Sequence, residues 1–151
     1  MSQKQLAIIG GVGIGPVMIG LPMADVRAAL GEPTNRFRKV PDSPRLTDAY
    51  DPLGVHVYYD DADCVECVES FAVIGAVHLL DGLPVFDTPA TKLIAAVWKK
   101  AAVRSEERGT SFVAPIVGLA FWRSDEEATT FETVLVASPA YFARTIDRSQ
   151  F

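Results

Sequence analysis

The chain has 151 residues, of which 49% are hydrophobic and 22% are charged, and its formal net charge at pH 7 is −5. These values indicate one globular domain, residues 1–151, that is long enough to bury a core without disulfides or a metal. They exclude a disordered chain, and two cysteines are too few for a secreted disulfide scaffold. The negative charge also argues against nucleic acid as a partner, because that affinity depends on neutralising phosphates.

The first predicted element is a glycine-rich stretch, residues 6–24, that contains no charged residue. Its length would suit a membrane span or a signal peptide, but five glycines and two prolines disfavour a continuous helix. The letters LAIIGGVGIG also imitate a dinucleotide-binding motif, yet Pro16 or Met18 falls where the last glycine is required. We therefore predict a glycine-rich loop or strand edge, with neither a membrane segment nor a nucleotide cofactor.

Two helices are predicted, one in each half of the chain. Residues 22–33 (PMADVRAALGEP) have apolar residues at helical spacing, and Gly31 with Pro33 ends the helix. Residues 89–101 repeat this pattern after Pro89, which suits a first helical turn. Three lysines of the second helix point away from its apolar stripe. The stripes consist of Met23, Val26, Ala29 and Leu30 in the first helix, and of Leu93, Ile94, Val97, Trp98 and Ala101 in the second.

Short strands follow each helix, and their sequences indicate an internal duplication. GVHVYYD begins at Gly54 and GLAFWRS begins at Gly118. VECV at 65–68 matches FETV at 131–134 if the turn before it is two residues longer in the second copy. The predicted unit is a helix followed by three antiparallel strands. The units and the tail span residues 14–73, 76–138 and 139–151.

The arrangement of these elements follows from what each must bury. Each predicted helix has one apolar stripe, and strands joined by short turns pair antiparallel. The predicted fold class is therefore α+β. The strands would form one antiparallel sheet or two abutting sheets. Both helices would pack on one sheet face, and the other face would stay partly open to solvent.

Cys64 and Cys67 form a CxxC spacing within DCVECVES, and we interpret them as ordinary residues of a turn and a strand. Cys67 aligns with Thr133 of the second copy, and no helix pattern follows Cys64, although redox CxxC pairs normally open a helix. A zinc site would need two further ligands, and only His56 lies near in the sequence. Metal and redox roles stay open as less favoured alternatives. We predict no metal site and no cofactor.

No common catalytic motif occurs, so the sequence predicts no catalytic residue. We interpret Asp60, Asp61 and Asp63 as the solvated tip of a hairpin, because the glycine turn and distal glutamate of a calcium loop are absent. His78, within AVHLL, is expected to be a core or edge histidine.

Alternation along the strand that starts at Gly54 separates its side chains into two faces. His56, Tyr58 and Asp60 share the face opposite the aliphatic residues, and Trp122 holds the position that matches Tyr58. If the aliphatic face meets the helices, both aromatics lie on the open face, where Tyr and Trp commonly anchor protein partners. The alternative is that both fill a second small core under the tail. The predicted partner-binding residues are His56, Tyr58, Asp60, Asp61, Asp63 and Trp122.

Residues 14–33 (IGPVMIGLPMADVRAALGEP) resemble the opening of the repeats in the β-lactamase inhibitor protein and in small outer-membrane assembly lipoproteins. The resemblance is carried by Gly20, Val26, Leu30, Gly31 and Pro33. It implies a helix followed by an antiparallel sheet. For the inhibitor protein it also implies a tandem duplication whose aromatic-rich concave sheet binds the target. The likeness extends to immunity-type proteins that neutralise a toxin.

These observations favour a non-enzymatic protein-interaction module, an inhibitor- or immunity-like binder located in the cytoplasm. Its partner is expected to be a protein with a basic surface, because complementary charge steers encounter and penalises wrong partners. The alternative is a small-molecule-binding or enzymatic domain with a pocket between the two repeats.

Overall fold

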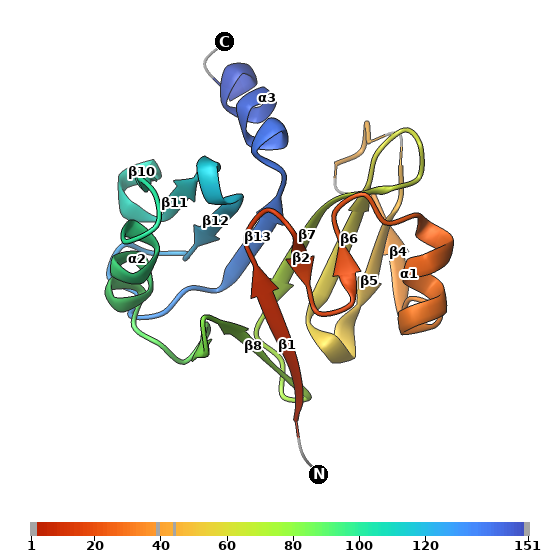
Figure 1. Ribbon diagram of the computed structural model, residues 1–151, viewed down its shortest axis with the longest axis horizontal. Helices are drawn as coiled ribbons and strands as arrows, with labels where there is room; N and C mark the ends of the chain where they lie inside the picture. Colours follow the sequence, from red (N-terminus) through yellow and green to blue (C-terminus); the bar gives the residue numbers. More distant parts are fainter. Residues whose placement is uncertain (1–2, 39, 44, 150–151) are drawn as a thin grey trace.

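Strands dominate the computed structural model, which describes residues 3–38, 40–43 and 45–149, the last five as backbone only (Figure 1). About 39% of the residues are in strands and 23% are helical. The strands are β1 (Lys4–Ile9), β2 (Gly13–Ile14), β3 (Val17–Met18), β4 (Asn35–Phe37), β5 (Thr47–Tyr50), β6 (Val55–Tyr59), β7 (Val65–Phe71), β8 (Ala76–Leu80), β9 (Leu83–Pro84), β10 (Arg104–Glu106), β11 (Ser111–Ala114), β12 (Leu119–Trp122) and β13 (Thr133–Ala137). The helices are α1 (Met23–Leu30), α2 (Ala90–Trp98) and α3 (Pro139–Ser149), with short 3-10 turns η1 (Asp51–Leu53), η2 (Glu107–Gly109) and η3 (Pro115–Val117).

The strands form two sheets. The larger sheet has eight strands in the order β10-β11-β12-β13-β7-β6-β5-β4, and all its neighbours are antiparallel. The smaller sheet has the order β3-β2-β1-β8-β9. Its central strand β1 runs antiparallel to β2 and parallel to β8. β1 and β2 lie in front of β7 and β13 in Figure 1, and the core cluster joins side chains from both sheets.

The prediction of an α+β fold with both helices on one sheet face is wrong. The core-facing side of the large sheet, with Val57 and Val134, is covered by the small sheet through Leu6 and Ile8. α1 and α2 lie at opposite ends of the molecule (Figure 1). These helices have only eight and nine residues, so neither is long enough to cover an eight-stranded sheet. Their apolar stripes still bury side chains, since Val26 and Leu93 are both fully buried.

The two segments predicted as copies have matching corners. Gly54 follows η1 with φ 67° and ψ 42°, and Gly118 follows η3 with φ 67° and ψ 39°. Both positions favour glycine because this left-handed conformation strains other residues. Val55 pairs with Ser70, whereas Leu119 pairs with Val136, so the connection in the second segment is two residues longer. Descent from a duplication stays a prediction.

The pairing of β7 with β13 decides how matched positions are placed in space. Glu69 and Leu135, which correspond in the two segments, lie directly opposite each other in this antiparallel pair. The two segments are therefore related by an approximate two-fold rotation about an axis through this pair. As a result, other matched positions lie on opposite sides of the axis rather than next to each other.

The predicted tail forms α3, apart from residues 150–151, which lie outside the described part. Ser138 caps this helix, because its hydroxyl accepts a hydrogen bond from the backbone N–H of Tyr141 at 3.2 Å. Phe142 is buried against the outer face of the large sheet, in a small cluster with Tyr58 and Cys67. Throughout the described residues, every helix is too short or too polar to cross a membrane.

Candidate functional site

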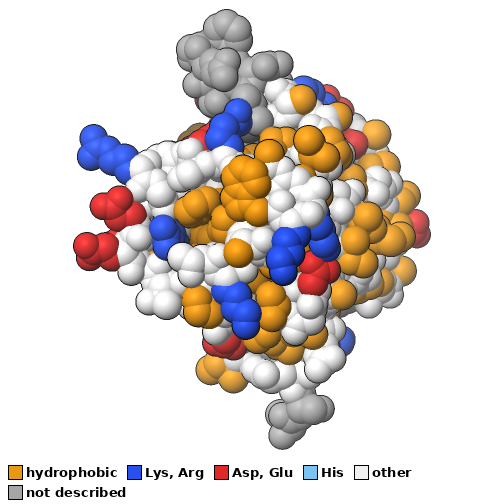
Figure 2. All heavy atoms as spheres, turned by 60° about the vertical axis from the view of Figure 1, so that its left-hand side comes forward, with side chains coloured by type: hydrophobic (Ala, Val, Ile, Leu, Met, Phe, Trp, Pro, Cys, Tyr) orange, Lys and Arg blue, Asp and Glu red, His pale blue; other side chains and the backbone are white. Residues whose placement is uncertain are grey.

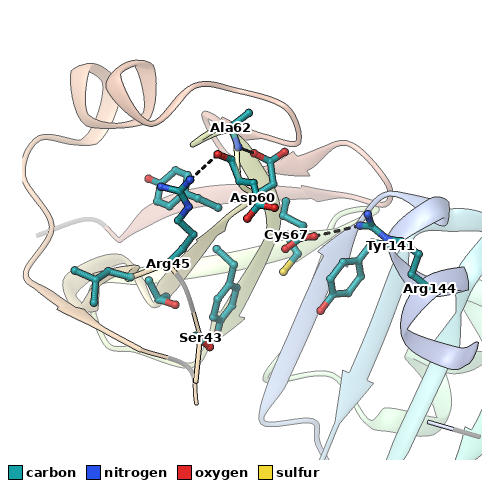
Figure 3. Close-up of a pocket in the computed structure, with 13 residues that line it drawn as sticks. Ser43, Arg45, Asp60, Ala62, Cys67, Tyr141 and Arg144 are labelled. Carbon is teal, nitrogen blue, oxygen red and sulfur yellow. Dashed lines mark hydrogen bonds and ion pairs between the residues drawn. The ribbon is translucent and has the colours of Figure 1, made fainter. Parts of the chain in front are cut away.

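A cleft of about 740 Å³ lies beside the acidic tip of the β6–β7 hairpin. Its walls come from residues around Arg45, from the end of β6 with the following turn, from the start of β7, and from α3. Figure 3 shows Arg45 on one side of the cleft, and Tyr141 and Arg144 on the other, with Cys67 between them. The cleft thus lies between the first repeat segment and the C-terminal helix.

Asp60 shapes the tip of the hairpin. One of its carboxylate oxygens accepts the backbone N–H groups of Ala62 at 2.9 Å and of Cys64 at 3.0 Å. Such a side-chain bond to the backbone two residues ahead fixes the turn. Asp63 then adopts a left-handed conformation with φ 58°, which aspartate tolerates better than most residues. Asp61 and Asp63 are exposed at the tip as a consequence.

Two arginines hold the walls of the cleft. Arg45 contacts the Asp63 carboxylate at 2.9 Å and donates to the backbone carbonyl of Asp61 at 2.6 Å. Arg144 of α3 contacts Glu66 at 3.1 Å. All these side chains are partly exposed, so each ion pair contributes little stability. The charges of both arginines are balanced by the carboxylates that they contact. Asp60 and Asp61 therefore give the lining of the cleft a net negative charge.

Tyr58 lies in the floor of the cleft and is buried under α3. Its hydroxyl lies 3.5 Å from the Glu69 carboxylate. Burial, with the nearby Glu69 charge as a second cause, raises the pKa of Tyr58 well above its ordinary value. The phenol therefore stays protonated at physiological pH. The sequence left two placements open for Tyr58, on an open sheet face or in a second small core under the tail. Tyr58 lies in the second small core, with Phe142 of α3.

His56 lies on the same outer face as Tyr58, outside the cleft. Its ring is placed between Phe37 and Phe71, with ring centroids 5.1 and 4.6 Å away. Its nitrogens lie 3.9 Å from an Asp51 oxygen and 3.8 Å from a Glu69 oxygen. Burial lowers the pKa of His56, and the two carboxylates oppose this shift only in part. The imidazole is therefore neutral near pH 7.

Trp122 is 41% exposed on the outer face but lies far from Tyr58. Trp122 shares a row with Thr133 and Phe71, whereas Tyr58 pairs with Cys67. From strand geometry the two aromatics are separated by about 14 Å across the sheet and about 13 Å along it. The predicted face is thus divided between the cleft, which contains Tyr58, Asp60 and Asp61, and a distant Trp122.

Sequence reasoning assigned no site role to four residues of the cleft, namely Glu66 of β7 and, from other segments, Arg45, Tyr141 and Arg144. Arg45 had no pattern around it that indicates a site. The tail did contain a usable signal, because Ser138 followed by Pro139 is typical of a helix start and would have predicted α3. Even so, the docking of α3 beside the hairpin is a tertiary contact that no local pattern shows.

The two cysteines occupy a turn and a strand. Cys67 is buried in β7, opposite Tyr58 and Ala137. Cys64 is half-buried at the tip, where it forms an isolated bridge with Pro22. Neither cysteine forms a disulfide. Among the described residues, no group of three or more His, Cys, Asp or Glu side chains is arranged to hold a metal ion.

Comparisons with protein families, curated proteins and solved structures found no match to this chain. The resemblance of residues 14–33 to the β-lactamase inhibitor protein and the assembly lipoproteins therefore stays a prediction from those residues.

Proposed function

We propose that the protein is a non-enzymatic interaction module, an inhibitor- or immunity-like binder, and that its cleft takes a protruding basic segment of a protein partner. The observation that carries the proposal is the cleft itself: about 740 Å³ of space beside a tip that exposes carboxylates. A cytoplasmic location belongs to the same proposal.

Charge is the first support for a basic segment. Arg45 and Arg144 each contact a carboxylate, whereas the Asp61 carboxylate forms no ion pair with any of the described residues. A lysine or arginine from the partner could therefore pair with Asp61 without displacing an existing ion pair. Exposed charges of this kind mainly increase the association rate and the selectivity for partners of opposite charge.

The aromatic walls are the second support. Tyr141 lines the cleft from α3 and is half-buried, so part of its surface is accessible. Tyrosine rings attract cations over their faces, and tyrosine is enriched among residues that dominate binding energy at protein interfaces. Tyr58 forms the floor and is already packed, which gives the cleft a rigid base.

A second candidate function is small-molecule binding or catalysis, and the volume of the cleft favours it. Pockets for drug-sized ligands span about 300–1,000 Å³, a range that includes this cleft. The place differs from the sequence-based alternative, which put a pocket between the two repeats. The cleft lies between the first segment and α3.

The test compares wild-type protein with Asp61→Lys, using Glu126→Lys as the matched control. Glu126 is also an exposed carboxylate, in the corresponding turn of the second segment. Each protein is used to isolate partners from the source cells, and the partner identified is then purified and its affinity measured at several salt concentrations. We expect a basic protein that binds Asp61→Lys at least tenfold more weakly, mainly through slower association.

Equal binding by wild type and Asp61→Lys, or a partner without basic residues at the contact, would refute the proposal. A small molecule that copurifies with wild type and is lost in Asp61→Lys would establish the second candidate. Circular dichroism and thermal unfolding of both variants should match wild type, because both substituted side chains are exposed.

A further inference from the structure

A second hollow, which shares no lining residue with the cleft, lies between β1, η3 and the end of α2. This groove has a volume of about 360 Å³. Its floor is apolar and buried, whereas Ile9 and Ile116 at its rim are 55% and 76% exposed. The floor consists of Ile8, Leu80, Val97 and Leu119.

Gly10 explains how the two rim isoleucines come to flank the groove. A Cβ atom at this position would lie 2.1 Å from the carbonyl oxygen of Val117. Only glycine therefore lets the end of β1 come this close to η3. The approach places Ile9 of β1 and Ile116 of η3 on the rim of the same hollow. Large aliphatic side chains exposed beside an apolar hollow are typical of an interaction site.

The segment formed by α2 and the residues that follow it is rich in cations, in contrast to the chain as a whole. Residues 88–105 contain four cations and no carboxylate, although the net charge of the protein is −5. Two of these cations are already paired, Lys100 at the groove with Asp81 at 2.6 Å and Arg104 with Glu106 at 2.9 Å. Lys99 and Trp98 beside it are exposed, Trp98 by 54%. Figure 2 brings this side forward and shows hydrophobic side chains in patches, with Lys and Arg between them and Asp or Glu beside some of these cations.

We propose that the groove binds an acidic protein segment that inserts large apolar side chains between Ile9 and Ile116. The apolar floor and rim provide the contact, and exposed Lys99 after the end of α2 provides charge complementarity to a flanking Asp or Glu residue. A flat anionic membrane fits less well, because the floor residues are buried at the bottom of a hollow. This site is independent of the proposed cleft function.

The experiment selects binders from a random peptide library displayed on phage, with the intact protein as bait. The selected peptides are then titrated against wild type, Ile116→Ser, Lys99→Glu, Ile74→Ser and the cleft variant Asp61→Lys. Ile74→Ser is the matched control, since Ile74 is 94% exposed and does not line the groove. We expect peptides with a large apolar residue flanked by Asp or Glu. Their affinity should fall at least tenfold in Ile116→Ser and severalfold in Lys99→Glu, and stay unchanged in Ile74→Ser.

Several results would overturn the inference. Peptides that bind Ile116→Ser as well as wild type, an absence of enriched peptides, or enrichment of basic peptides would each do so. Self-association in solution that is lost in Ile116→Ser would assign the groove to a second copy of the chain. Flotation with anionic vesicles that is lost in Ile116→Ser would assign it to a lipid surface. Peptides that lose affinity only for Asp61→Lys would belong to the cleft and test the proposed function instead.

Discussion

Replacing Asp48 with alanine removes the central acceptor of a hydrogen-bond network in the first segment. The Asp48 side chain is fully buried and accepts from the Tyr59 hydroxyl at 2.9 Å. It also accepts from Arg36 at 2.9 Å, and from Arg27 of α1 at 3.1 and 3.3 Å. The corresponding position of the second segment is Phe112, so this network belongs to one segment only.

The size of the expected effect follows from the exposure of the partners. Removing one member of a fully buried ion pair costs about 3–5 kcal/mol. The Arg27 and Arg36 side chains are 26% and 38% exposed, so both can turn to water and the cost is reduced. The Tyr59 hydroxyl is buried and would lose its acceptor, which costs about 1–3 kcal/mol. We expect Asp48→Ala to lower the free energy of unfolding by about 3 kcal/mol.

Urea unfolding followed by circular dichroism measures this change, because a loss of about 3 kcal/mol moves the midpoint by roughly 1.5 M. Tyr59→Phe should cost about 1 kcal/mol alone. In the Asp48→Ala background, Tyr59→Phe should not lower the free energy of unfolding further, because it removes a hydroxyl that has already lost its acceptor. Asp42→Ala, at an exposed carboxylate, is the control. A loss below about 1 kcal/mol in Asp48→Ala, or equal effects of Tyr59→Phe in both backgrounds, would refute the reasoning.

Two further predictions concern buried groups. His78 is buried, and its Nε2 contacts the Leu53 carbonyl at 2.8 Å. Burial lowers the pKa of His78 in the folded state. As pH falls below about 6.5, the unfolded chain therefore takes up a proton at this histidine before the folded chain does. The free energy of unfolding should therefore decrease from pH 7 to pH 5, and it should decrease less steeply in His78→Gln. His56 adds a change of the same sign in both proteins. The same pH dependence of the free energy of unfolding in wild type and His78→Gln would contradict this prediction. Cys64→Ser should leave thermal stability unchanged and Cys67→Ser should lower it, because only Cys67 is fully buried; bound zinc at one ion per chain would contradict this interpretation.

The positions of α1 and α2 could be read from apolar spacing and from their prolines, and the corners at Gly54 and Gly118 from the matched sequences. The second sheet could not be read in this way. In β1 the buried Leu6 and Ile8 alternate with exposed Ala7 and Ile9, which are also apolar, so no alternation is visible in the sequence. The core face was therefore assigned to the helices instead of to a second sheet.

The acidic hairpin tip of the candidate site was also readable, because Asp-rich turns between strand patterns have a local signature. Its neighbours were not, since Arg45 and Arg144 reach the cleft only through the tertiary fold. The separation of Trp122 from Tyr58 depends on β7 pairing antiparallel with β13. Sequence similarity between two segments gives no information about the rotation that relates them.

The place of β1 between β2 and β8 has a consequence for synthesis. β1 leaves the ribosome before β8, and the two strands pair from Lys4 with Ala76 onward. One edge of β1 therefore stays unpaired until β8 has been made. Contacts between segments so distant in sequence form slowly, and an open strand edge is where exchange between two nascent chains can begin. Because this one strand completes the sheet for both segments, neither segment can finish folding alone, even though the two look like repeats of a single unit.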